Sequence, residues 1–153
     1  MRSAVWLAAI ALAMTAVAAT QTPPAASKAP DACSLLTKED AAAALGETAQ
    51  GPKATNAPNG PSACEYTGSG IHRVQLNVIP MDAATAAVYK GMCAKKGKEG
   101  LTGLGDTTCW YNDKHEELQV LKGLTLLSIE LRRSGDPTEP IKAVAQKIYS
   151  RLK

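Results

Sequence analysis

The sequence predicts an α+β domain in which a single antiparallel β-sheet of about five strands is packed by two to three helices and stapled by disulfides. Strand-like segments follow one another through short hairpin turns, and helix-like segments begin at N-cap residues and carry apolar stripes. The expected order is α-β-β-α-β-β-β-α. Because strands and helices do not alternate throughout, this order favours an antiparallel sheet with helices packed on it.

The first helix is predicted over residues 38–45. Thr37 supplies an N-cap hydroxyl, and two acidic residues lie in the first turn, where the helix dipole favours negative charge. Leu36 is placed to pack against Ala41 as a hydrophobic staple. Gly46 can adopt the left-handed conformation that ends a helix.

Residues 51–60 are rich in Pro, Asn and Gly, and this composition predicts a long surface loop. The next two segments, 62–67 and 71–79, are separated by Gly-Ser-Gly, which predicts a hairpin. In the second segment apolar and polar residues alternate, so one face of the sheet is expected to be buried and the other wet.

A second helix is expected after Pro80, from an N-cap at Asp82 through about Lys96. The residues expected to point inward are Val88, Met92 and Tyr89.

Three further strands are predicted over residues 107–111, 117–121 and 124–132, joined by short turns into a meander. The final helix carries one apolar stripe, formed by Ile141, Val144, Ala145, Ile148 and Leu152. Its opposite face is expected to be solvated and consists of Lys142, Lys147 and Arg151.

The N-terminal residues 1–19 have the three parts of a secretory signal peptide: the basic Arg2, an apolar stretch over 4–14 and a small-residue cleavage region. The apolar stretch is shorter than the about 20 residues needed to cross a bilayer, so no membrane span is expected after cleavage. Residues 20–30 contain three prolines and little to bury, which predicts a flexible linker. A single domain over 31–153, periplasmic or secreted, is expected.

Four cysteines follow the predicted signal peptide, and four cysteines allow three pairings that a sequence alone does not distinguish. We expect nearest neighbours along the chain to pair, Cys33 with Cys64 and Cys93 with Cys109. Structural disulfides are typical of a small exported domain. Neither the Cys-x-x-Cys spacing of redox-active thiols nor the close Cys or His pairs of a zinc site occur.

Charge and motifs indicate no particular chemistry. The chain has 17 basic and 14 acidic residues, and loss of Arg2 with the signal peptide would leave a net charge near +2, which argues against a nucleic-acid partner. Residues 115–119 read His-Glu-Glu-Leu-Gln, so the second histidine of a metalloprotease motif is missing. The glycines of the 97–105 loop follow a helix rather than a strand, unlike a dinucleotide fingerprint. No cofactor and no metal are expected.

The candidate binding residues are two adjacent aromatics and a glycine-rich loop. Trp110 and Tyr111 lie in one strand and should point to opposite faces, so one of them could be open to a partner. The alternative is that Trp110 fills the core and Tyr111 lies at the sheet rim. The loop contributes Gly103, Gly105 and Asp106.

Four short motifs lie in the mature domain: Asp-Ala-Cys-Ser-Leu-Leu-Thr-Lys-Glu-Asp at 31–40, Ala-Leu-Gly at 44–46, Ser-Ala-Cys-Glu-Tyr at 62–66 and Gly-Leu-Gly-Asp at 103–106. In these motifs the chain resembles a family of uncharacterised bacterial exported proteins, many of them lipoproteins. The resemblance implies an extracytoplasmic α+β domain and a bridge between Cys33 and Cys64. This chain lacks the lipidated cysteine, so membrane anchoring does not carry over, and no catalytic residues come with the resemblance.

The leading hypothesis is a non-enzymatic exported domain that binds an unknown protein or envelope ligand with its sheet face or the 97–106 loop. One specific version is a periplasmic immunity or inhibitor protein. The alternative is a small secreted hydrolase whose acid pair would come from Asp106, Asp113, Glu116 and Glu117.

Overall fold

A computed structural model describes residues 29–96 and 102–152, so the predicted signal peptide (1–19) and nearly all of the predicted linker (20–30) lie outside the described residues. The helices are α1 (Ala32–Leu35), α2 (Lys38–Leu45), α3 (Ala83–Cys93) and α4 (Thr138–Arg151). The strands are β1 (Gln50–Asn56), β2 (Ser62–Thr67), β3 (Arg73–Pro80), β4 (Thr107–Trp110), β5 (Glu117–Lys122) and β6 (Thr125–Arg132). Within the described ranges, none of these helices has the length and apolar character to span a bilayer.

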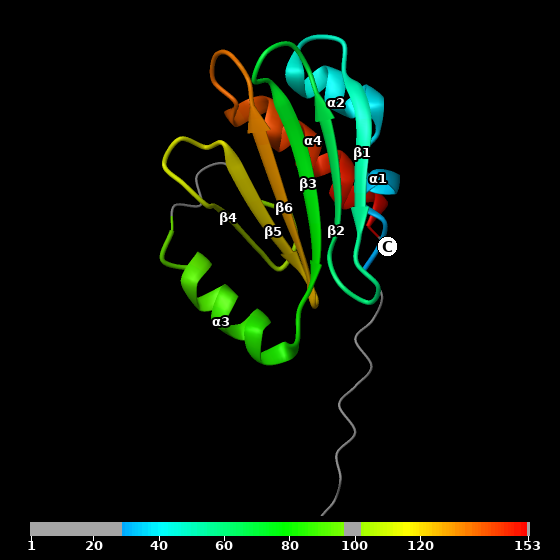
Figure 1. The fold of residues 1–153 in the computed structure, drawn as a ribbon. Coiled ribbons are helices and arrows are strands. Elements are labelled where there is room, and N and C mark those ends of the chain that lie inside the picture. The colour runs from blue at the N-terminus through cyan, green and yellow to red at the C-terminus, as the bar shows by residue number, and fades with distance from the viewer. Residues whose placement is uncertain (1–28, 97–101, 153) are drawn as a thin grey trace, which may run out of the picture.

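The predicted fold class is confirmed, with one more strand than expected and with the short α1 as one more helix. All six strands form one antiparallel sheet in the order β1-β2-β3-β6-β5-β4 (Figure 1). The expected loop over residues 51–60 is wrong, because most of this stretch forms the edge strand β1, paired with β2. Every residue of β1 is exposed, so no apolar alternation marks it, and an edge strand tolerates Pro52 because its outer side needs no ladder hydrogen bond.

The main core lies between one face of the sheet and the helices α1, α2 and α4, which Figure 1 shows behind the strands. Alternate residues of β3 and β6 face this core in register: Val74 opposite Leu131, Leu76 opposite Ile129 and Val78 opposite Leu127. The predicted stripe of α4 packs on them, and all five of its residues are buried. The apolar residues of the helix, which recur about every 3.6 residues, therefore pack against the apolar residues of the strands, which recur every two, in one aliphatic layer.

The helix α2 has the predicted boundaries, with a capping box between Thr37 and Asp40 and Gly46 in the left-handed conformation at φ 73°. On the basic face of α4 that was expected to be solvated, Lys147 and Arg151 are exposed. Lys147 and Arg151 both reach the buried Asp40 carboxylate, which ties α4 to the first turn of α2.

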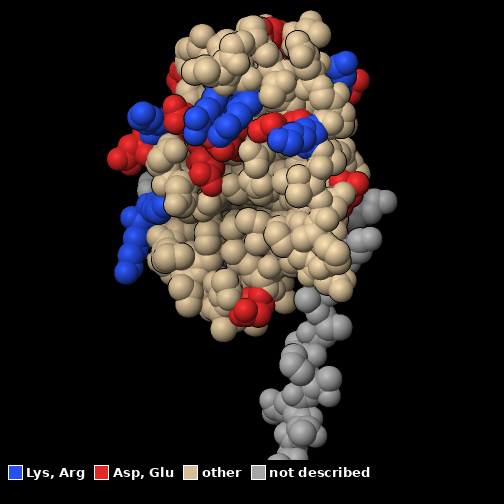
Figure 2. Space-filling model, in the orientation of Figure 1, with Lys and Arg blue, Asp and Glu red and all other residues tan. Residues whose placement is uncertain are grey.

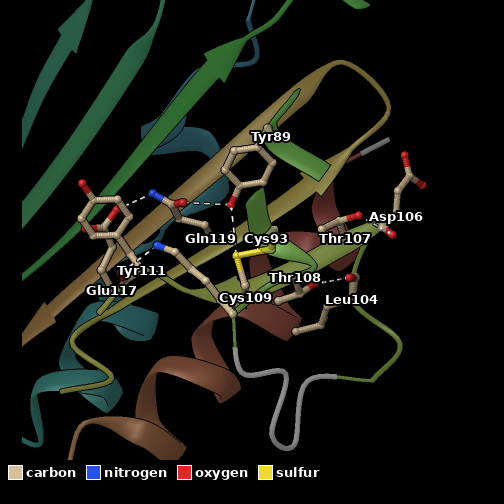
Figure 3. Close-up of a disulfide and its surroundings, with 11 residues drawn as sticks. Tyr89, Cys93, Leu104, Asp106, Thr107, Thr108, Cys109, Tyr111, Glu117 and Gln119 are labelled. Carbon is tan, nitrogen blue, oxygen red and sulfur yellow. Dashed lines mark hydrogen bonds between the residues drawn. A yellow bond between two sulfur atoms is a disulfide. The ribbon is translucent and has the colours of Figure 1, made fainter. Parts of the chain in front are cut away.

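The helix α3 packs alone on part of the opposite sheet face (Figure 1) and ends at Cys93 rather than near Lys96. Its predicted orientation is largely wrong: the side chains of Val88 and Met92 are 62% and 54% exposed, whereas Tyr89 is buried as expected. The inward face consists of Ala86, Tyr89 and Cys93. A disulfide from Cys93 to β4 fixes this rotation of the helix (Figure 3).

Both expected disulfides are present. Cys33 in α1 is bonded to Cys64 in β2, and Cys93 at the end of α3 is bonded to Cys109 in β4. Each bond joins a helix to the sheet, the first on the main-core face and the second on the face that α3 covers. Two structural disulfides are typical of proteins that fold in an oxidising compartment.

Candidate functional site

The face of the sheet on which α3 packs is only partly covered. Beneath α3 lies the apolar end of this face, where Leu121 and Leu126 pack against the helix. Beyond the helix the same face is polar, and Figure 2 shows charged side chains of both signs in a belt across it. The strand register places on this open face Arg73, Gln75, Asn77, Glu117, Gln119, Ser128, Glu130 and Arg132.

The polar groups of the open face are held by one another. One oxygen of Glu117, Oε1, accepts hydrogen bonds from Gln119 Nε2 at 2.8 Å and from Ser128 Oγ at 2.7 Å. The Tyr89 hydroxyl of α3 donates to Gln119 Oε1 at 2.9 Å (Figure 3). Burial of that hydroxyl, assisted by the negative charge of Glu117, raises the pKa of Tyr89 well above its usual range. Tyr89 therefore remains a neutral donor, and the amide and carboxylate have fixed orientations.

A second set of contacts orders the other side of the belt. Glu130 Oε1 accepts from Arg73 Nη2 at 2.9 Å and from Arg132 Nε at 2.7 Å. Burial opposes ionisation of Glu130, but these two guanidinium groups outweigh it and lower the pKa of the carboxyl. The open face is thus an ordered array of paired charges and amides.

The two aromatics named from the sequence have opposite positions. Trp110 belongs to the main core and stacks on the ring of His115, with centroids 4.5 Å apart and an interplanar angle of 23°. Its indole Nε1 is buried and has no hydrogen-bond partner among the described residues. Tyr111, by contrast, is 56% exposed at the end of β4. Of the two, Tyr111 is available to a partner.

Tyr111 stands at the rim of the open face beside a surface pocket. The Lys96 ammonium lies 4.5 Å from the centre of the Tyr111 ring and donates a hydrogen bond of 2.9 Å to the Tyr111 carbonyl oxygen. The pocket has a volume of about 380 Å³ and is lined by Lys95, Lys96, Trp110, Tyr111, Asn112, Asp113 and His115. This cation–π contact fixes the aromatic ring at the edge of the pocket.

The loop residues named from the sequence lie at the other end of β4. Gly105 has φ 63°, and a Cβ atom on it would come within 2.4 Å of the Leu121 carbonyl oxygen. Asp106 Oδ2 accepts a hydrogen bond of 2.8 Å from the Gly123 backbone N–H, which holds the β5–β6 turn. The five steps along the chain from Asp106 to Tyr111 span about 16 Å of strand, so the structure does not bring these two groups into one site. Residues 97–101 of this loop lie outside the described residues.

The same separation divides the four carboxylates considered for hydrolysis. Asp113, Glu116 and Glu117 lie at the Tyr111 end of the hairpin, away from Asp106. His115, the first residue of the near-miss metalloprotease motif, lies in the turn with φ 55° rather than on a helix. Among the described residues, no group of three or more His, Cys, Asp or Glu side chains is arranged to hold a metal ion.

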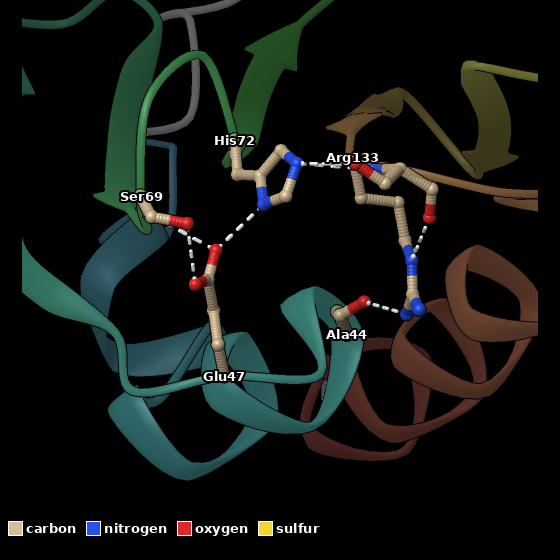
Figure 4. A network of polar contacts seen from close by, with 6 residues as sticks. Ala44, Glu47, Ser69, His72 and Arg133 are labelled. Carbon is tan, nitrogen blue, oxygen red and sulfur yellow. Dashed lines mark hydrogen bonds and ion pairs between the residues drawn. The ribbon is translucent and has the colours of Figure 1, made fainter.

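A second polar cluster, which sequence reasoning did not predict, joins three loops at the α2 end of the sheet (Figure 4). His72 Nδ1 lies 2.6 Å from Glu47 Oε1, and His72 Nε2 lies 2.9 Å from Ser134 Oγ. Hydrogen bonds from the hydroxyl and backbone N–H of Ser69, followed by His72, lower the pKa of Glu47 to about 2. A shallow pocket of about 290 Å³ adjoins the histidine and is lined by Glu65, Thr67, Gly70, Ile71, His72, Arg73 and Arg132.

His72 lies directly before β3. Glu47 and Ser134 lie 25 and 62 residues away from it along the chain, so no local motif links the three. Comparisons of the chain with protein-family models, with curated proteins and with solved structures give no match. Function is therefore inferred from the geometry of these surfaces.

Proposed function

We propose that this chain is an exported binding domain that recognises a protein or envelope ligand with the open face of its sheet. The observation that carries the proposal is the position of Tyr111, an exposed aromatic held by Lys96 at the rim of an ordered polar face and beside a pocket. Tyrosine and arginine are the residue types that contribute most to binding energy at protein interfaces. The open face supplies both, because Arg73 and Arg132 belong to its belt of charged side chains.

The proposed location is the periplasm or the exterior of the cell. The signal-like residues 1–19 support export, and two disulfides suit an oxidising compartment. The resemblance to a family of exported proteins supports the same location.

A protein partner suits the open face better than a small molecule does. The face is broad, and its charges of opposite sign are interspersed, so a partner of complementary charge pattern gains specificity. A periplasmic enzyme blocked by this domain, as an inhibitor or immunity protein requires, is one such partner. We propose that this face binds its partner without catalysing a reaction, because the carboxylates of Glu117 and Glu130 already accept hydrogen bonds from neighbouring donors.

The proposal is tested by capture from an envelope extract with the oxidised chain, followed by titration of the purified partner. Tyr111→Ala is expected to weaken capture at least tenfold while leaving the fold intact, because the side chain is mostly exposed. Leu124→Ala is the matched control, since Leu124 is also exposed but lies in the β5–β6 turn. Trp110→Ala is not suitable, because Trp110 belongs to the core.

A stoichiometric complex with the parent and with Leu124→Ala, weakened at least tenfold by Tyr111→Ala, is the expected result. Equal binding by all three proteins would show that Tyr111 and the open face beside it are not the binding surface. Absence of any stable partner would contradict the binding function itself.

A further inference from the structure

We propose that Ser134 is an activated nucleophile, served by His72 as general base, and that it accepts acyl groups from small esters. Glu47 acts as a positioning residue for the imidazole. This activity goes beyond the proposed binding function. Glu47, His72 and Ser134 are not among the residues of the open face, although the pocket beside His72 shares Arg73 and Arg132 with that face. The two proposals are tested by different variants, so either can fail without the other.

The geometry is a continuous chain of carboxylate, imidazole and hydroxyl. Glu47 Oε1 lies 2.6 Å from His72 Nδ1, and His72 Nε2 lies 2.9 Å from Ser134 Oγ. Both distances are within hydrogen-bond reach, which is the arrangement that activates a serine: the base contacts the nucleophile and an acid orients the base. Each of the three residues comes from a different loop, and the strands of one sheet position these loops next to one another (Figure 4).

A second contact at Ser134 fixes which imidazole nitrogen carries the proton. The backbone N–H of Ser134 donates to His72 Nε2 at 3.1 Å. A backbone N–H can only donate, so Nε2 is the acceptor, and Nδ1 carries the hydrogen that points to Glu47. This is the tautomer in which Nε2 can take the Ser134 hydroxyl proton. Glu47 is itself held by two hydrogen bonds from Ser69, which keep the carboxylate in position.

The surroundings of Ser134 also let a substrate reach the hydroxyl and supply a donor for the negative charge that develops on the substrate oxygen. Ser134 is exposed, and the shallow pocket of about 290 Å³ beside His72 offers the exposed Ile71 as an apolar wall for a short acyl chain. Gly135 follows with φ 82°, and its backbone N–H has no hydrogen-bond partner among the described residues. The N–H after a nucleophilic serine is a donor that stabilises the oxyanion in other serine enzymes, and Gly135 is in that position.

The step is an acyl transfer. Ser134 Oγ attacks the ester carbonyl carbon while its proton passes to His72 Nε2. The bond from that carbon to the alcohol oxygen then breaks, and the departing oxygen takes the proton from His72. Ser134 is left as an acyl ester and His72 is neutral again. Water activated by the same nitrogen can release the acyl group as a carboxylic acid.

The test is a time course with p-nitrophenyl acetate on the full oxidised chain, read as released p-nitrophenol and as acetylation of Ser134 by peptide mass spectrometry. We expect one equivalent of acetyl group on Ser134, none at this position in Ser134→Ala, and an acylation rate reduced by about 10²–10⁴-fold in His72→Gln. Ser150→Ala is the control: it removes an exposed serine of α4 whose hydroxyl bonds, among the described residues, only to the Lys147 carbonyl oxygen, and it keeps nucleophile, base and positioning carboxylate. It should remain reactive.

The role of Glu47 has a spectroscopic readout. A short imidazole–carboxylate bond of 2.6 Å should give a far-downfield Nδ1 proton resonance, which Ser134→Ala retains and Glu47→Gln loses together with the fast acylation. Thermal unfolding of each variant separates loss of chemistry from loss of fold. The proposal is overturned if Ser134 is not acetylated, or if its acetylation proceeds at the same rate in His72→Gln. Neither outcome affects capture of a partner through Tyr111.

Discussion

Asp40 allows a sharp test of how the helical layer is held on the sheet. Asp40 is 2% exposed, and its carboxylate completes the capping box of α2 by accepting from the Thr37 backbone and hydroxyl. It also accepts from Lys147 and Arg151 of α4. Burial alone would raise the pKa of this carboxyl, but the hydrogen bonds from Arg151 and Thr37 outweigh burial and lower it.

The perturbation is Asp40→Ala, and its cost has two parts. Loss of the reciprocal cap is worth about 1 kcal/mol. Removing one partner of a buried ion pair costs about 3–5 kcal/mol when the other partner stays desolvated. Here Arg151 and Lys147 are 35% and 52% exposed, so water can reach them and this part falls to about 2 kcal/mol. We therefore expect a total loss of about 3 kcal/mol.

The assay is urea unfolding of the oxidised protein followed by circular dichroism. With a slope of about 2 kcal/mol per molar urea, the expected loss lowers the midpoint by roughly 1.5 M. Asp82→Ala is the matched control, because Asp82 caps α3 through the same two contacts, backbone and hydroxyl of one threonine, but pairs with no cation among the described residues. Asp40→Ala should be clearly the more damaging. Equal losses from the two substitutions would refute the idea that the buried pairs with α4 contribute to stability.

Three further outcomes are expected. Replacing Cys93 and Cys109 together by Ser should cost roughly 3 kcal/mol of unfolding free energy by the chain-entropy relation for a 16-residue separation, and hydrogen exchange should show the loss first in α3. Gly105→Ala should lower the urea midpoint more than Gly103→Ala does, because both glycines have positive φ but only at Gly105 would a new Cβ meet a backbone oxygen; equal effects would mean that the close approach is unimportant. Because folding lowers the pKa of Glu47 from 4.5 to about 2, its stabilising effect should be complete above pH 4.5 and fade as the pH falls toward 2. Melting curves of the parent and of Glu47→Gln should accordingly converge in acid, and a constant difference down to pH 2 would contradict this linkage.

Much of the fold was predictable because its signals are local. The boundaries of α2 follow from one capping threonine and one C-terminal glycine, and the β2–β3 hairpin follows from Gly-Ser-Gly and the alternation in the segment after it. The edge strand β1 has no such signal, since a strand exposed on both faces needs no apolar alternation. The rotation of α3 was predicted wrongly because Val88 and Met92 are the large apolar residues, whereas the disulfide at Cys93 decides which side faces the sheet.

The candidate sites were predictable only in part, for a related reason. Adjacent strand residues alternate between faces, so the sequence could indicate that Trp110 and Tyr111 differ in exposure without indicating which one is open. The structure places Trp110 in the core and Tyr111 at the rim. The cluster of Glu47, His72 and Ser134 depends on the register of three distant loops, and no spacing within the sequence encodes that register.

The helix α3 connects the fold to the proposed binding function. It contributes only a small apolar face, formed by Ala86, Tyr89 and Cys93, and its end is fastened to β4 by a disulfide. The Tyr89 hydroxyl of the same helix donates to Gln119, where the apolar end of the sheet face meets the polar belt. Position and length of α3 therefore decide where the covered part of the sheet ends and the open face begins. A partner that docks on the open face would meet α3 as a wall, so the disulfide that fixes the helix also fixes one border of the proposed interface.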